Sequence, residues 1–121
     1  MSLLSKFQGI YAMPKSGSNI GKLMLVVDVE FEEDSNKLSK IKLLDVKTNK
    51  KVLMKASNVE SYKRNGKVVR ATRVTHGNST YLVTVKGLII SLTTNKVMRW
   101  ADDDIIAQTI RLSAVVANDC R

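Results

Sequence analysis

The chain has 121 residues, 44% hydrophobic and 26% charged, which is an ordinary composition for a globular protein of one domain. It contains one histidine and one cysteine, too few for most transition-metal sites and too few for an internal disulfide bond. The formal net charge of +9 is high for this length and indicates an anionic partner.

The region before residue 33 predicts two strands. One covers residues 7–13 and ends at Pro14. The other, over residues 22–32, alternates with a period of two, which is typical of a strand with one face toward the core. After Lys22, its first half is apolar on both faces, so we expect that half to be covered on both sides. The odd-numbered residues predicted to face the core are Leu23, Leu25, Val27, Val29 and Phe31.

Residues 40–47 predict the next strand, in which the apolar positions shift by one between Leu43 and Leu44. Such a shift is typical of a β-bulge, so we expect one within this strand. A polar turn over residues 47–51 then leads into a strand over residues 52–56.

Asparagine marks the hairpin turns farther along the chain. Asn65-Gly66 is the strongest two-residue hairpin signal, and it joins predicted strands over residues 60–64 and 67–75. Residues 43–50 resemble residues 89–96, with asparagine at the same place in both turns. We therefore expect the same hairpin chemistry to be used twice.

The C-terminal part predicts further strands over residues 80–86, 88–92 and 97–100, and then an amphipathic helix over about residues 102–117. Apolar residues recur in the helix at steps of three and four. The aspartates at 102–104 stand where helix capping and the helix dipole favour them, a Mg²⁺ site being the alternative. The apolar stripe is wide, so we expect the helix to pack on the sheet or against another subunit.

The sequence therefore predicts a mainly β protein with a single domain over residues 1–121. An antiparallel meander of about seven to eight strands, over about residues 7–100, forms a small barrel or a sandwich, with the C-terminal helix after it. This succession resembles, in topology alone, several small barrels, including pleckstrin-homology-like domains. Shared topology does not transfer function.

No catalytic site, cofactor or metal site is expected. His76 lies in a turn beside glycine and asparagine, with no orienting partner near it in sequence. Cys120 is next to the end of the chain, where a shell of activating groups is rare. We expect neither residue to be catalytic, and the protein to be no enzyme.

Three acidic residues, Asp28, Glu30 and Glu32, share one face of the predicted strand over residues 22–32. A basic partner strand carrying Lys40 and Lys42 would pair with them across the sheet. A site for a hard cation is the alternative.

The positive charge is concentrated in the middle of the chain. Residues 37–73 hold twelve of the twenty basic residues and two acidic ones, so this segment carries +10 and the rest of the chain −1. Two predicted hairpin turns each gather about three cations. The residues expected to contact an anion are Lys47, Lys50, Lys51, Lys63, Arg64, Lys67, Arg70 and Arg73.

We therefore expect a non-catalytic protein that binds an anionic partner through basic hairpins, with nucleic acid as the leading candidate. Few aromatic residues lie among the cations, which favours contacts to phosphates over base stacking. One alternative is an interaction module, such as a small intracellular or phage-encoded inhibitor, that docks on an acidic protein surface and forms a homo-oligomer through the C-terminal helix or strand edges. Another is a binder of a small phosphorylated ligand. A lysine-rich surface that serves solubility and protects strand edges is the reading without a ligand.

The chain contains no apolar run close to the ~18 residues of a membrane span, and its N-terminus lacks the apolar segment of a secretion signal. We therefore expect an intracellular, cytoplasmic protein with no membrane partner.

Overall fold

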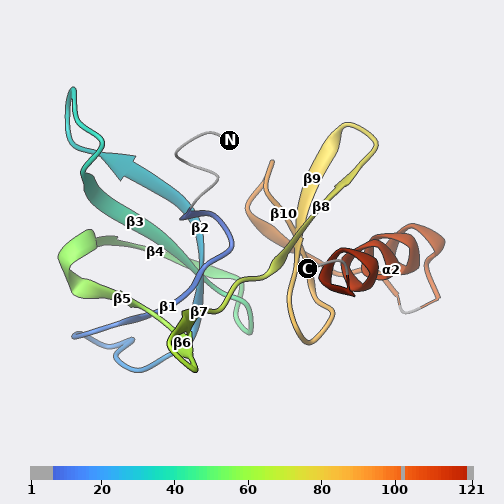
Figure 1. The fold of residues 1–121 in the computed structure, drawn as a ribbon, viewed down its shortest axis with the longest axis horizontal. Coiled ribbons are helices and arrows are strands. Elements are labelled where there is room, and N and C mark those ends of the chain that lie inside the picture. Colours follow the sequence, from blue (N-terminus) through green and yellow to red (C-terminus); the bar gives the residue numbers. More distant parts are fainter. Residues whose placement is uncertain (1–6, 102, 120–121) are drawn as a thin grey trace. The chain divides into compact units, whose positions relative to one another are not determined.

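The computed structural model describes residues 7–101 and 103–119, which form two compact units, Met1–Arg70 and Ala71–Arg121 (Figure 1). Strand makes up 46% of the chain and helix 15%, and all sheets are antiparallel, so the predicted mainly β fold with a C-terminal helix is confirmed. The described residues hold 11 strands, more than the seven to eight predicted, in part because the predicted strands over 60–64 and 67–75 each break in two. The single domain over residues 1–121 remains a prediction.

The first unit contains a five-stranded sheet of order β4-β3-β2-β1-β5. Its strands are β1 (Tyr11–Pro14), β2 (Met24–Phe31), β3 (Leu38–Asp45), β4 (Lys50–Lys55) and β5 (Val59–Ser61).

This sheet curls toward itself without closing into a barrel. Its edge strands β4 and β5 are joined only by the short 3-10 helix η1 (Ala56–Asn58). Edges four strands apart in a flat sheet are about 19 Å apart, whereas so short a link spans at most about 14 Å. The curled inner face encloses an aliphatic core of Ile10, Ala12, Met24, Val26, Val29, Ile41 and Leu43. No ladder joins β4 to β5 in the part of the chain that the structure describes.

The bulge predicted between Leu43 and Leu44 is wrong, because β3 pairs with β4 there without a break. The irregularity lies across from it on β2. Val26 pairs with Leu43 and Asp28 with Lys42, which leaves Val27 as the extra residue.

The extra residue on β2 reverses the alternation of its side chains. Before it, Met24 and Val26 contribute to the core cluster, and after it Val29 and Phe31 do. The prediction that the odd-numbered residues face the core is therefore correct only for the second half of the strand. All four residues from Met24 to Val27 are buried, so the expectation that this half is covered on both sides is confirmed.

The second unit is a four-stranded sheet of order β11-β10-β9-β8, with one helix packed on it. The helix α2 contributes Ala107, Ile110 and Ala114 to a core that it shares with Val74, Val83 and Ile89. The elements are β8 (Thr72–His76), β9 (Ser79–Val83), β10 (Ile89–Ser91), β11 (Lys96–Met98) and α2 (Ile105–Asp119).

Helix α2 begins with a side-chain cap, as expected from the aspartates before it. The Asp104 carboxylate accepts hydrogen bonds from the backbone N–H groups of Ile106 (2.9 Å) and Ala107 (3.2 Å). These are two of the donors that a helix leaves without partners at its N-terminus. Asp102 lies outside the described residues. No helix of the described chain is long and apolar enough to cross a membrane.

The repeated hairpin chemistry is also confirmed, with one copy in each unit. Asn49 has φ +60° and its N–H donates to the carbonyl of Asp45 (2.8 Å). Asn95 has φ +55° and its N–H donates to the carbonyl of Ser91 (2.7 Å). Asparagine tolerates this left-handed backbone better than most residues, and both turns depend on it.

Candidate functional site

All eight predicted cations are exposed, but they do not lie on one element. Seven belong to the first unit, and Arg73 belongs to β8 in the second. The strand predicted over residues 67–75 breaks at residues 69–71, because the backbone there pairs with β1: Arg70 forms a bridge with Ile10. Arg70 and Arg73 are therefore not neighbours on a single strand.

Lys63, Arg64 and Lys67 are gathered by a small hairpin, formed by β6 (Lys63–Arg64) and β7 (Lys67–Val68). Its turn is Asn65-Gly66, with φ of +55° and +78°, as a two-residue type I′ turn requires. The predicted turn is therefore confirmed. We call residues 63–67 the basic hairpin.

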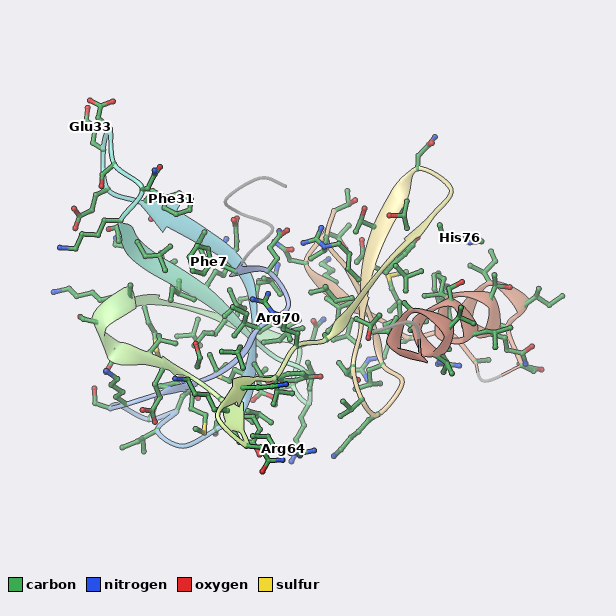
Figure 2. All side chains as sticks on the ribbon, in the orientation of Figure 1. Phe7, Phe31, Glu33, Arg64, Arg70 and His76 are labelled. Carbon is green, nitrogen blue, oxygen red and sulfur yellow. The ribbon has the colours of Figure 1, made fainter. Side chains whose placement is uncertain are left out.

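The register of the basic hairpin sets two cations directly opposite each other. Arg64 pairs with Lys67, and Lys63 pairs with Val68. Like charges in direct cross-strand positions destabilise a hairpin. None of these three cations forms an ion pair with the part of the chain that the structure describes. Figure 2 shows Arg64 at the outer end of the hairpin.

The base of the basic hairpin is fixed to the sheet by backbone hydrogen bonds to one residue of β1. Tyr62 donates to the carbonyl of Tyr11 (2.8 Å), and Tyr11 donates to the carbonyl of Val69 (3.0 Å). Val69 in turn donates to the carbonyl of Tyr62 (3.1 Å), which closes the base. Val68 packs against the core of the first unit. The cations are thus presented from an ordered support.

The turn between β3 and β4 carries Lys47, Lys50 and Lys51. It differs from the basic hairpin because it also contains an acidic residue. Asp45 pairs with Lys50 across the hairpin, and its carboxylate accepts a hydrogen bond from the backbone N–H of Lys47 (3.0 Å). A carboxylate among three lysines lowers the positive charge that this turn presents. The turn therefore carries a net charge of +2, against +3 for the basic hairpin.

The two groups of cations are carried by different parts of the sheet. The β3–β4 turn joins the edge strand β4 to β3, whereas the basic hairpin is attached to β1, which lies between β2 and the other edge strand, β5. The structure therefore brings the predicted cations together as two groups of three, with Arg70 at the base of the basic hairpin.

The acidic residues of β2 are paired as expected. Asp28 lies opposite Lys42, and Glu30 lies opposite Lys40. This register confirms the cross-strand interpretation of the acidic face. It also means that Lys40 and Lys42 have acidic neighbours, in contrast to the basic hairpin.

The remaining reactive side chains are dispersed. His76 ends β8 and pairs with Ser79 across a turn, and Cys120 lies outside the described residues. No group of three or more His, Cys, Asp or Glu residues that could hold a metal ion occurs in residues 7–101 and 103–119.

Comparison of the chain with protein-family models, with curated proteins and with solved structures finds no match. The function is therefore argued from the chain's own residues.

Proposed function

We propose that this protein is a non-catalytic nucleic-acid-binding protein whose basic hairpin contacts the phosphate backbone. Lys63, Arg64 and Lys67 make the contacts, and Arg70 extends the surface at the base. The observation that supports this most strongly is the direct pairing of Arg64 with Lys67 on an exposed hairpin.

A bound anion relieves the repulsion between Arg64 and Lys67, which hydration alone does not. In the sheet of the first unit, Lys42 and Lys40 each have an acidic neighbour on β2, Asp28 and Glu30, although Lys40 also faces Lys55 on β4. In the basic hairpin the two central cations face each other instead, at a cost to folding of about 0.2–1 kcal/mol. A phosphate placed between them interacts favourably with both and removes that repulsion.

The chemistry of the hairpin tip favours nucleic acid over an acidic protein. Protein interfaces depend on a few anchors that fill pockets, mostly Trp, Tyr and Arg, and Arg64 is the only such residue among residues 63–67. Contacts to phosphates need only charge and exposure, which these residues have. Since the base is already ordered by Tyr11, little conformational entropy is lost on binding.

Binding is tested by fluorescence anisotropy with a labelled RNA strand and a labelled DNA duplex, from about 50 to about 200 mM salt. The variant Lys63→Glu/Arg64→Glu/Lys67→Glu removes the three contacts. On duplex DNA, the slope of log K against log salt becomes less steep by about 2.7, at about 0.9 per lost contact.

The matched control is Lys86→Glu/Lys96→Glu/Arg99→Glu, which makes the same change of charge on exposed residues of the second unit. It retains most of the binding if the basic hairpin is the site. Circular dichroism confirms that both variants are folded. The proposal is overturned if the protein binds neither probe at low salt, if both variants lose the same affinity, or if polyglutamate binds as tightly as nucleic acid.

A further inference from the structure

Helix α2 is apolar on two opposite sides. Ala107, Ile110 and Ala114 are buried against the sheet of the second unit. On the opposite side, Ile105, Leu112 and Val116 expose 78%, 65% and 54% of their surface, and Val115 and Ile106 flank them at 54% and 47%. A helix that is apolar all round is normally covered on both sides.

The exposed residues form a continuous line. Ile105, Leu112 and Val116 are spaced by seven and four residues, so at 3.6 residues per turn they lie above one another along α2. Thr109 completes the line one turn after Ile105. We call Ile105, Thr109, Leu112 and Val116 the outer stripe.

The outer stripe is uncharged, and its hydroxyl groups have partners within the helix. The Thr109 hydroxyl donates to the carbonyl of Ile105 (2.8 Å), and the Ser113 hydroxyl beside it donates to the carbonyl of Thr109 (2.9 Å). Arg111 is the only charged residue from 105 to 117, and its Nε donates to the carbonyl of Gly87 (2.9 Å) at the sheet. Covering the stripe therefore leaves no buried donor or charge without a partner.

We infer that the outer stripe is covered by the outer stripe of a second copy of this chain, with the two α2 helices antiparallel. The stripe is centred between residues 110 and 111, so a two-fold axis there sets Ile105 against the partner's Val116. The same axis sets Leu112 against the partner's smaller Thr109. Large and small side chains thus alternate across the contact, and the stripe is complementary to itself, as an isologous interface requires.

The charge distribution is compatible with a second copy. The net positive charge lies in residues 37–73, and the rest of the chain, which includes α2, carries −1. The uncharged stripe is a place where two copies can meet without setting like charges together.

The apolar area fits a weak dimer. At about 60–120 Å² for a whole aliphatic side chain, the three apolar residues of the outer stripe offer about 120–240 Å² per copy, and Ile106 and Val115, on opposite flanks of the helix, add to this only in part. Two copies then supply about 240–470 Å² from the stripe, less than the apolar share of the smallest specific interfaces, which bury about 1,200 Å² in total, so the dimer should be weak. We therefore expect a dissociation constant in the micromolar range.

Sedimentation velocity of the full chain tests this. The protein concentration is varied from about 1 to about 300 µM, because so small an interface gives weak association. Over this range the average mass is expected to rise from that of one chain toward that of two. Leu112→Glu and Leu112→Lys each set like charges about 5 Å apart along the helix axis at the two-fold. Each should raise the dissociation constant at least about 30-fold. An equimolar mixture of the two variants should dimerise again, because a carboxylate then meets an ammonium group.

Val85→Glu is the matched control, because Val85 is 83% exposed and lies in the turn between β9 and β10. It should dimerise like the unchanged chain, and circular dichroism confirms that all variants are folded. The inference is overturned if the unchanged chain stays a monomer at about 300 µM, if the Leu112 variants associate as it does, or if their mixture stays monomeric.

Discussion

Lys67→Glu should make the protein more stable and, at the same time, a weaker binder of nucleic acid. In the unchanged hairpin Lys67 faces Arg64, so the substitution replaces a like-charge pair by an opposite-charge pair. Removing the repulsion and adding an attraction each contribute about 0.2–1 kcal/mol. Both side chains are exposed, which places the total near the low end, at about 0.5–1 kcal/mol.

Lys42→Glu makes the same chemical change with the opposite expected sign. Lys42 lies opposite Asp28 and is half-buried, so the substitution creates a like-charge pair where an opposite-charge pair stood. We expect a loss of about 1–2 kcal/mol in the free energy of unfolding. The two variants share the net charge of the chain and differ in burial and in what the register sets across from them.

Urea denaturation of both variants measures these changes, with anisotropy titrations on the same samples. Lys67→Glu should also make the salt slope of binding to duplex DNA less steep by about 0.9, the value for one lost contact. Near 1 M salt, where the screening length is about 3 Å, the stability differences between the variants should shrink. A loss of stability in Lys67→Glu comparable to that in Lys42→Glu would refute the argument from opposed cations.

Two further predictions concern local backbone features. Gly66→Ala should destabilise the first unit by about 1–2 kcal/mol. The φ angle at Gly66 is +78° and an added Cβ meets no atom within 4 Å, so the cost is that of the left-handed backbone alone. The expected result is a lower urea midpoint with an unchanged m value, and an unchanged midpoint would contradict it. Asp104→Ala should lower the stability of the second unit by about 1 kcal/mol, because it removes the cap of α2. Asp103→Ala, at an exposed position before the cap, should change thermal unfolding little. Equal losses of stability in the two variants would contradict the assignment of the cap.

Where a local signal determines the structure, the sequence alone was sufficient to predict that structure. Asn65-Gly66 located a turn whose type also fixes the hairpin register, so the pairing of Arg64 with Lys67 followed from residues next to each other in the chain. Asparagine at 49 and 95 marked two turns of the same kind for the same reason.

Where both faces of a segment are buried, the apolar pattern contains no information on register. Residues Met24 to Val27 are apolar throughout, so nothing in them shows that Val27 is the extra residue. The break after β7 was equally hidden, because it depends on Tyr11 and Ile10, far away in the sequence, pairing with residues 69–70.

The candidate site was predictable in part. The sequence identified the exposed cations, but which of them have an acid opposite depends on strand register, as with Asp45 beside the lysines of the β3–β4 turn. The attachment of the basic hairpin to β1 depends on strand order, which hairpin signals do not specify.

The attachment of the basic hairpin to Tyr11 has a consequence for how such a protein can diversify. Residues 62 and 69 both hold β1, so the chain enters and leaves the hairpin at one point of an otherwise completed edge. A loop inserted at that point can be lengthened, shortened or exchanged by recombination while the aliphatic interior is preserved, provided that an apolar residue replaces Val68. The scaffold and the side chains that the hairpin presents are thereby free to evolve at different rates.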